Sequence, residues 1–196
     1  PLSHGAGVVA LCLLASAATQ VILPKFDAES VLAAIERDRV THMFLPPTAI
    51  YMLLSAPSVR RRDLSSMRCL LYAGAPMSEE RLREALEVFG PVMTQTYGQA
   101  EAPLICTVLC PVEHVEALDR APHRLRSCGR PTMFTEVSLL DDDGQVVEPG
   151  TEGEICVRGN LAMTGYLQDQ NIANVPRAAN AWHRTGDVGR FDEDGY

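Results

Sequence analysis

The sequence is short of positive charge. Its 17 Lys and Arg residues stand against 25 Asp and Glu residues, which gives a formal net charge of −8. A protein that binds DNA or RNA in general needs a basic face to displace counterions from the phosphate backbone. The charge balance therefore argues against a nucleic-acid partner, although it permits a single bound nucleotide held by a few groups.

Long hydrophobic runs are also missing. The apolar stretch at residues 8–18 is too short to span a bilayer, which takes about 20 residues, and no basic leader precedes it. We therefore expect a buried helix there and neither a transmembrane segment nor a signal peptide. The composition, 46% hydrophobic and 21% charged, is close to the globular average and excludes a disordered or collagen-like chain.

Cysteine patterns typical of metal sites are lacking too. No C-x-x-C occurs, and no cysteine pairs with His at zinc-finger spacing. We interpret the six cysteines as reduced, mostly structural thiols of a cytosolic protein. His114 and His123 lie in a polar segment without a second ligand pair, so we expect surface histidines. The triple Arg at residues 60–62 fits a phosphate site or a solvated turn, and we favour the turn.

Helix and strand signals alternate over the first two-thirds of the chain. Asp27 and Ser78 are predicted N-caps, and Pro46-Pro47 is a predicted helix start. We expect helices over residues 7–18, 28–35, 47–54 and 79–88, and strands over residues 19–23, 42–45, 68–72 and 92–96. This alternation predicts an α/β fold in which a parallel sheet is covered by helices.

The pattern changes in the last third of the chain. Short strands are expected at 136–140, 145–147 and 154–158, with turns between them, which predicts a smaller antiparallel β or distorted barrel-like subdomain. We therefore expect an α/β subdomain at 1–110, a connector at 111–134 containing a loop or short helix, and the β subdomain at 135–196. The chain starts without Met and stops just after a turn signal, so we expect a piece of a longer protein.

Two loops follow neighbouring predicted strands, where α/β sheets bind ligands. The first, Gly74-Ala75-Pro76, offers small residues and open backbone to a flat ring. The second, Tyr97-Gly98-Gln99-Ala100-Glu101, offers an aromatic face at Tyr97 and a carboxylate at Glu101 that suits a hard cation beside phosphates. Taken singly, each loop is more typical of an ordinary turn than of a ligand site.

A third candidate lies near the end of the chain. Asp187 follows Gly186 after a short predicted strand, and a carboxylate there can accept hydrogen bonds from two vicinal hydroxyls, as in ribose recognition. The alternative is an Asp that caps a turn.

Taken in order, four short motifs resemble the adenylate-forming superfamily of acyl- and aryl-CoA synthetases, luciferases and peptide-synthetase adenylation domains. The motifs are Gly74-Ala75-Pro76; Tyr97-Gly98-Gln99-Ala100-Glu101; Gly153-Glu154-Ile155 with Gly159 and Gly165-Tyr166-Leu167; and Arg184-Thr185-Gly186-Asp187. The resemblance covers nearly the whole chain but less than half of a usual family member. It implies a phosphate loop before residue 1, and a hinge and C-terminal domain with a catalytic lysine after residue 196.

The resemblance also implies roles for single residues. Gly74, Ala75 and Pro76 would line the adenine pocket, Tyr97 would stack on adenine within the loop that includes Gly98 and Gln99, Asp187 would hold the ribose, and Glu101, the implied catalytic residue, would help to hold Mg²⁺. His4 would stand on the acyl side, with an ordinary helix-start His as the alternative. The sequence departs from the family at Ala100, where a Ser or Thr hydroxyl usually reaches the α-phosphate. A backbone amide or Gln99 would have to serve instead.

For the parent protein, the resemblance implies a cytoplasmic ligase that uses ATP, Mg²⁺ and coenzyme A. A carboxylic acid would be activated as an acyl-adenylate and then transferred to the thiol of coenzyme A. The sequence around Tyr97 resembles that of fatty- or aryl-acid CoA ligases more than that of the alternative, a peptide-synthetase-type adenylation domain. Without its two missing parts, the chain itself is expected to be inactive, and a non-catalytic nucleotide-binding or structural piece is the remaining alternative.

Overall fold

Helices and short strands alternate along most of the chain. A computed structural model describes residues 5–166 and 182–196. The helices are α1 (Gly5–Ala15), α2 (Ala28–Asp38), α3 (Pro47–Leu54), η1 (Val59–Arg61), α4 (Glu79–Phe89), α5 (Pro111–Asp119) and η2 (Pro122–Arg126). The strands are β1 (His42–Leu45), β2 (Cys69–Tyr72), β3 (Met93–Tyr97), β4 (Thr107–Leu109), β5 (Arg130–Pro131), β6 (Glu136–Leu140), β7 (Gly153–Arg158) and β8 (His183–Gly189).

The described strands form two sheets. The larger has the order β1-β2-β3-β4-β5, and the smaller has the order β6-β7-β8. β1, β2 and β3 pair in parallel, whereas β4 and β5 pair antiparallel, so the larger sheet is mixed. The smaller sheet is antiparallel throughout. The predicted fold class, an α/β sheet with helices followed by a smaller antiparallel β part, is confirmed.

The chain divides into two compact units that alternate along the sequence. Residues 1–95 and 109–127 form the first unit, and residues 96–108 and 128–196 form the second. The domain boundaries expected near residues 110 and 135 stay a prediction. The compact units are defined by contacts, and each combines two separate stretches of the chain.

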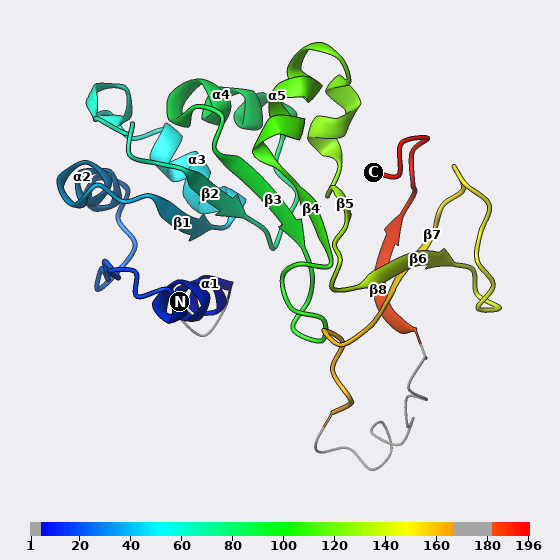
Figure 1. Cartoon of the computed structure of the whole chain (residues 1–196). Helices are drawn as coiled ribbons and strands as arrows, with labels where there is room; N and C mark the ends of the chain where they lie inside the picture. Colours follow the sequence, from blue (N-terminus) through cyan, green and yellow to red (C-terminus); the bar gives the residue numbers. More distant parts are fainter. Residues whose placement is uncertain (1–4, 167–181) are drawn as a thin grey trace. The chain divides into compact units, whose positions relative to one another are not determined.

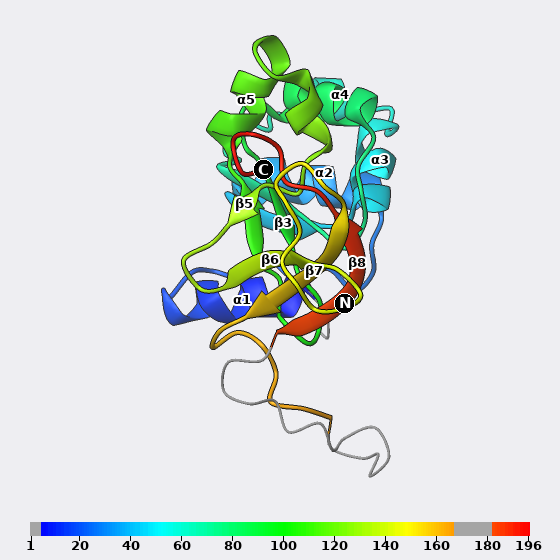
Figure 2. The same cartoon turned by 90° about the vertical axis from the view of Figure 1, so that its right-hand side faces the viewer.

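In the first unit, helices lie on both faces of the parallel strands. Figure 1 shows α3 and α4 on one side of β1–β3 and α1 on the other, and Figure 2 gives the same arrangement. The predicted N-caps are confirmed: Asp27 accepts a hydrogen bond from Ser30 N at 2.9 Å, and Ser78 Oγ accepts one from Arg81 N at 3.3 Å. Each cap satisfies an amide that a helix start leaves unpaired.

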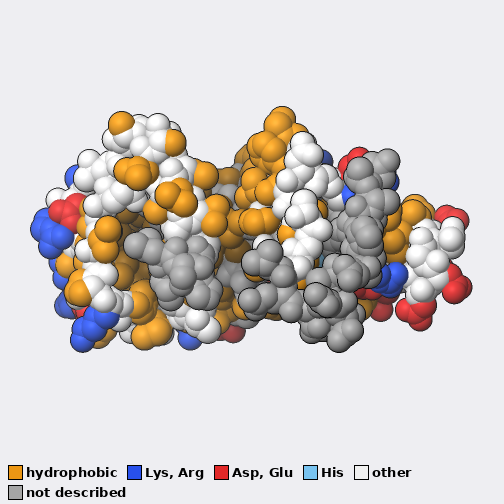
Figure 3. Space-filling model, turned by 90° about the horizontal axis from the view of Figure 1, so that it is seen from below, with side chains coloured by type: hydrophobic (Ala, Val, Ile, Leu, Met, Phe, Trp, Pro, Cys, Tyr) orange, Lys and Arg blue, Asp and Glu red, His pale blue; other side chains and the backbone are white. Residues whose placement is uncertain are grey.

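The helix near the N-terminus forms as predicted, but it is not a buried helix. Only Gly7 is buried, whereas Leu11 is 69% exposed and Leu14 is 59% exposed. Hydrophobic side chains appear on the face seen from below in Figure 3, the side on which α1 lies. An apolar sequence gives a buried helix only where other elements surround it, and among the described elements α1 packs mainly against β1.

The strand predicted at residues 19–23 is wrong. This stretch has no regular structure, and Val21 and Ile22 are 41% and 71% exposed. An apolar run forms a strand only where a partner offers a ladder of hydrogen bonds. The strand expected at 145–147 is likewise reduced to an isolated bridge between Leu140 and Val146.

His114 is also not a surface residue. It is fully buried, with Nδ1 2.9 Å from Cys110 O and Nε2 2.9 Å from Tyr72 Oη. Because a carbonyl can only accept, Nδ1 carries the proton of the neutral ring and donates to Cys110 O. Burial lowers the pKa of His114 and so favours this neutral form. The segment around it forms α5 and η2, whereas His123 is exposed as expected.

In the second unit, β6, β7 and β8 form the antiparallel sheet. The pairing of β7 with β8 shifts register between Glu154 and Cys156, which marks a bulge. A small apolar cluster of Ala102, Cys106 and Val157 is buried in this unit. The bulge is important because Asp187 lies on the part of β8 that it displaces.

Candidate functional site

Tight packing shapes the loop that follows β3. A Cβ added to Gly98 would lie 2.5 Å from Leu104 N and 2.7 Å from Ala102 O, so no side chain fits there. Two backbone hydrogen bonds close the loop, from Gln99 N to Ala102 O and from Cys106 N to Tyr97 O. Gly98 is therefore required for a close backbone approach, and the loop places Tyr97 and Glu101 at defined positions.

The structure brings Tyr97, Gln99 and Asp187 together within the second unit. The Tyr97 hydroxyl donates to Asp187 Oδ2 at 2.5 Å, and Gln99 Nε2 donates to the same oxygen at 3.2 Å and to Thr185 O at 2.7 Å. The described residues give Asp187 Oδ1 no hydrogen-bond partner. An aromatic ring and an exposed carboxylate, about 90 residues apart in sequence, thus form one cluster.

The electrostatics of this cluster favour a neutral phenol beside a charged carboxylate. Partial burial and the hydrogen bond to Asp187 raise the pKa of Tyr97 well above its usual value. At neutral pH the ring therefore keeps its proton and donates it to Asp187. The ring face can contact a flat heterocycle while the carboxylate accepts from hydroxyl groups.

Side chains rather than the β ladder hold the backbone on either side of Gly186. Thr185 Oγ1 donates to Ile155 O at 2.7 Å and accepts from Asp187 N at 3.1 Å. Gly186 N donates to Glu154 Oε1 at 2.9 Å. Gly186 has φ of +77°, and a Cβ added there would meet no atom within 4 Å, so the backbone angle rather than lack of space requires glycine.

Glu101 has a partner of its own in the second unit. Its Oε1 accepts a hydrogen bond from the Tyr166 hydroxyl at 2.6 Å, and its backbone oxygen accepts one from Met163 N at 2.7 Å. The Tyr166 hydrogen bond is the main cause that lowers the pKa of Glu101. The side chain is therefore an oriented anion at neutral pH.

The site can supply one carboxylate to a cation. Within the described ranges, no group of three or more His, Cys, Asp or Glu side chains could hold a metal ion. Mg²⁺ takes one or two protein carboxylates and completes its shell with waters and substrate phosphates. The charged Glu101 carboxylate fits that pattern.

Gly74, Ala75 and Pro76 lie after β2 in the first unit. All three are exposed, and Gly74 has φ of +86°, which a side chain would strain. β2 pairs in parallel with β3, with Tyr72 opposite Gln95, so both strands end at the same edge of the sheet. Their place in the adenine pocket stays a prediction, and His4 lies outside the described residues.

Ala100 is exposed and offers no hydroxyl, as the sequence indicates. The Gln99 side-chain amide, one of the two substitutes expected, donates to Thr185 O and Asp187 instead. Of the two predicted substitutes, the backbone amide therefore stays a prediction.

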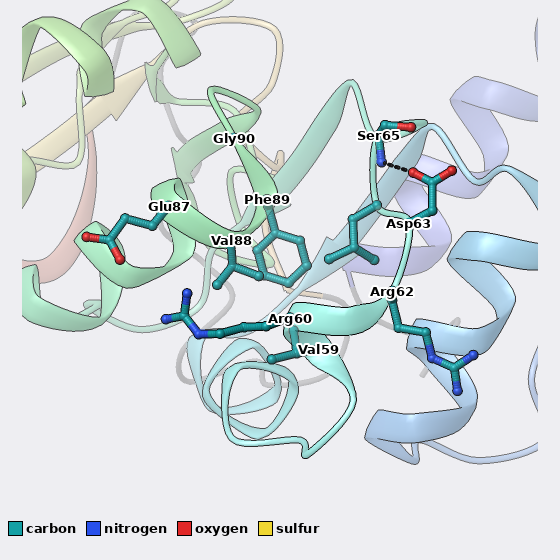
Figure 4. A pocket seen from close by; sticks show the side chains of 10 residues that line it. Val59, Arg60, Arg62, Asp63, Ser65, Glu87, Val88, Phe89 and Gly90 are labelled. Atoms are coloured by element: carbon teal, nitrogen blue, oxygen red, sulfur yellow. Dashed lines mark hydrogen bonds between the residues drawn. The ribbon is translucent and has the colours of Figure 1, made fainter.

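A hollow of about 480 Å³ in the first unit contains none of the predicted site residues. Figure 4 shows Arg60, Val88 and Phe89 along its wall. Arg62 pairs with Glu36 at 2.9 Å, and Arg60 lies 3.9 Å from Glu84. With these charges matched by carboxylates, the arginine segment fits the solvated turn better than a phosphate site.

All six cysteines are free thiols in the structure. Burial raises the pKa of Cys106 to about 11, so its thiol stays protonated and inert at neutral pH. None of the helices within the described ranges has the length and hydrophobicity that crossing a bilayer requires.

Comparison with known proteins identifies the family. Residues 1–167 match the family of AMP-binding enzymes. The chain belongs to this family. It is 40% identical, over its whole length, to a medium/long-chain-fatty-acid–CoA ligase of Mycobacterium tuberculosis, FadD8. The chain spans 33% of the length of that relative.

Solved structures of family members share the fold. The amide bond synthetase McbA of Marinactinospora thermotolerans superposes with a TM-score of 0.89 and 42% identity, and the match covers all of this chain and 38% of McbA. The O-succinylbenzoate coenzyme A synthetase MenE of Bacillus subtilis, in complex with AMP, gives a TM-score of 0.82 and 32% identity over all of this chain and 38% of that one. Family members with this fold thus include both CoA ligases and an amide synthetase.

Sequence reasoning assigned no role to three residues that shape the site. Glu154 and Arg184 hold the backbone before Asp187, and Tyr166 orients Glu101. All three lie inside motifs that the sequence reveals. Their contacts depend on register shifts and loop packing, which a sequence pattern does not encode.

Proposed function

We propose that this chain is the nucleotide-binding part of an ATP-dependent acid–CoA ligase. The proposal rests on the cluster in which Tyr97 Oη lies 2.5 Å from Asp187 Oδ2. An aromatic face and a carboxylate with one oxygen available, in a chain of the AMP-binding family, suit an adenine ring and a ribose. The six free cysteines support a cytoplasmic protein, since disulfides are rare there.

In the first half-reaction, an oxygen of the substrate carboxylate attacks the α-phosphorus of ATP. A carboxylate–phosphorus bond forms, the bond from the α-phosphorus to the oxygen that bridges to the β-phosphate breaks, and pyrophosphate leaves with that electron pair. No proton is abstracted, because the carboxylate is already a nucleophile. Tyr97 and Asp187 hold the nucleoside in place, so catalysis is mainly positioning and charge stabilisation.

Glu101 is the residue that would hold Mg²⁺, with Tyr166 orienting its carboxylate. The ion, when bound, supplies positive charge beside the phosphate oxygens. Backbone amides of the loop after β3 are the donors that we assign to the α-phosphate, because Ala100 has none. Gly74, Ala75 and Pro76 are the residues that we assign to the adenine pocket, and His4 to the acyl side.

In the second half-reaction, the sulfur of coenzyme A attacks the acyl carbon. A thioester bond forms, the acyl–phosphate bond breaks, AMP leaves with the electron pair, and the thiol proton passes to solvent. The acid is the least defined part of the reaction. We place fatty acids first and aryl acids second, because the similar mycobacterial relative is described as a fatty-acid ligase.

The test uses the full-length protein that contains this chain, with ATP, coenzyme A and a panel of fatty and aryl acids. We expect pyrophosphate release that depends on the acid, followed by AMP and a thioester. Asp187→Ala and Tyr97→Ala are each expected to weaken adenosine binding by about tenfold or more. Unchanged adenosine affinity in both variants would favour a structural domain instead.

Two further outcomes refine the assignment. The chain of residues 1–196 alone is expected to release no pyrophosphate, and measurable release would contradict that expectation. Amide synthesis is the second candidate, favoured by the similarity to McbA. Product formation with an amine but none with coenzyme A would move the assignment to that reaction.

A further inference from the structure

The Glu154 carboxylate joins β7 to the backbone just before Asp187. Its Oε2 accepts a hydrogen bond from Arg184 Nε at 2.6 Å and forms an ion pair with Arg184 Nη2 at 2.5 Å. Its Oε1 accepts from Gly186 N at 2.9 Å. One side chain thus contacts two positions on β8, the nearer of them one residue from the carboxylate that we assign to ribose.

These contacts replace a missing part of the β ladder. β7 and β8 pair at Glu154 with Val188 and again at Cys156 with Arg184. Three residues of β8 therefore lie opposite the single residue Ile155, and they have no register partners. An irregularity of this kind leaves backbone groups unpaired and redirects a side chain. Here Glu154 takes the amide of Gly186, and Thr185 takes that of Asp187.

Arg184 fixes the orientation of Glu154. Besides its contacts with Glu154, its Nη1 and Nη2 donate to Asp141 O, each at 3.2 Å. The Glu154 side chain is only 21% exposed, so it has little freedom to turn elsewhere. The guanidinium fork is geometrically specific for a carboxylate, unlike an ammonium group.

We propose that Glu154, held by Arg184, is a positioning residue that sets the Asp187 carboxylate at the geometry required by the two ribose hydroxyls. This inference rests on the proposed function. Glu154 acts through the backbone of Gly186, which carries Asp187 as the next residue. If the Glu154 contact is lost, residues 185–187 of β8, which have no partners in the β ladder, gain conformational freedom. The Asp187 carboxylate then loses its fixed direction.

The test compares ATP with 2′,3′-dideoxy-ATP, which lacks both hydroxyls, by equilibrium binding to the full-length protein. We expect the wild type to prefer ATP by about tenfold or more, the value of one or two hydrogen bonds to a charged group. Glu154→Gln keeps the size of the side chain and weakens the pair with Arg184. It is expected to reduce the preference for ATP severalfold, while 2′,3′-dideoxy-ATP binds within about twofold of the wild type.

Two further variants grade the effect. Glu154→Ala removes both contacts and is expected to reduce the preference more than Glu154→Gln does. Arg184→Met removes the positively charged partner of the ion pair and is expected to reduce the preference for ATP as Glu154→Gln does. Circular dichroism and thermal melting identify the temperature at which each variant is folded, and binding is measured there.

The same sheet offers a matched control. Glu136 pairs with Arg158 across β6 and β7, with Arg158 Nε 2.8 Å and Arg158 Nη2 2.5 Å from Glu136 Oε2. This ion pair has the same chemistry and lies in a regular part of the ladder. Glu136→Gln is expected to leave the preference for ATP unchanged.

The outcomes separate the inference from the function on which it rests. If Glu154→Gln weakens both nucleotides equally, or neither, Glu154 has no positioning role and the inference is overturned. If Asp187→Ala leaves the preference for ATP intact, Asp187 does not hold the ribose, and the proposed assignment fails together with the inference. Loss of preference in Asp187→Ala but not in the Glu154 variants overturns the inference alone.

Discussion

The two compact units differ in the size of the apolar clusters that their described residues form. In the first, a continuous apolar cluster extends from α2 through β2 and α4 to Leu125 in η2, with Leu32, Leu70 and Leu82 fully buried. In the second, the apolar cluster described above has three buried members among the residues that the structure describes. Networks of hydrogen bonds around Asp187 and Glu101 lie in this second unit.

This difference separates stability from geometry. Burial of apolar surface is large in energy and non-directional, so it stabilises a fold without fixing single atoms. Hydrogen bonds contribute less each, but they depend on angle and distance. We infer that substitutions in the first unit act mainly on unfolding, whereas polar substitutions in the second act mainly on the position of ligand-binding groups.

The largest effect on stability is expected from Leu70→Ala. This side chain is fully buried in β2, and its removal leaves a cavity in a close-packed core. The free energy of unfolding, measured by urea denaturation, is expected to fall by about 2–5 kcal/mol. Met52→Ala, at a side chain that is 54% exposed in α3, is the control and should change it by less than about 0.5 kcal/mol. A loss below about 1 kcal/mol for Leu70→Ala would contradict our inference that burial of apolar side chains dominates the stability of the first unit.

Gly98→Ala is the next largest change and tests packing in the second unit. The new Cβ would lie 2.5 Å from a backbone nitrogen, which cannot move without shifting the loop. We expect a loss of about 1–3 kcal/mol in stability and, in addition, weaker nucleotide binding, because Tyr97 and Glu101 flank this loop.

Gly74→Ala is the control for backbone strain, since a Cβ there has open space although φ is +86°. It is expected to cost about 1 kcal/mol, through strain at that angle. Because φ at Gly98 is not positive, a loss below about 0.5 kcal/mol for Gly98→Ala would mean that crowding there contributes nothing.

The contrast also explains which parts of the molecule the sequence predicts. The caps at Asp27 and Ser78 and the helices after them follow from local rules, and they form as expected. The stretch at 19–23 satisfies the local rule for a strand, but none of the described strands pairs with it. His114 is similar, because its burial depends on Tyr72, which lies 42 residues away.

In the site, residue types could be predicted but their supports could not. The motif order places Tyr97 and Asp187 in one family pattern, and they do lie in contact. The contact of Glu154 with Gly186 arises from a register shift in β8, and the contact of Tyr166 with Glu101 arises from a loop that returns to the site. Neither leaves a periodic signal in the sequence.

The stability of the first unit is expected to depend on pH through the buried His114. The pKa of His114 is lowered in the folded state, so the unfolded chain binds a proton first as the pH falls below about 6.5. Stability is therefore full above this pH and decreases below it, by at most about 1.4 kcal/mol per pH unit. His114→Gln, which cannot titrate, should show a shallower decrease between pH 6.5 and 5.5 in urea denaturation. Identical slopes would mean that protonation of His114 is not coupled to unfolding.

The smallest effect is expected from Tyr97→Phe, in the second unit. The substitution keeps the ring face for adenine and removes the hydroxyl that donates to Asp187 Oδ2. In the free protein the Tyr97 hydroxyl donates to Asp187 Oδ2, an oxygen that we assign to a ribose hydroxyl. Its loss therefore removes a group that competes with ribose for this oxygen, and also a hydrogen bond that orients the carboxylate. We expect these effects to offset each other and the affinity for adenosine to stay within about threefold of the wild type.

Tyr97→Ala is the matched variant, because it removes the ring together with the hydroxyl. Base–aromatic stacking contributes about 1–3 kcal/mol, so this variant should bind adenosine about tenfold more weakly or worse. If Tyr97→Phe binds as weakly as Tyr97→Ala, the hydrogen bond to Asp187 rather than the ring face is what holds the nucleoside. In that case the polar network of the second unit would account for binding as well as for geometry, and the division between the two units would be sharper than we infer.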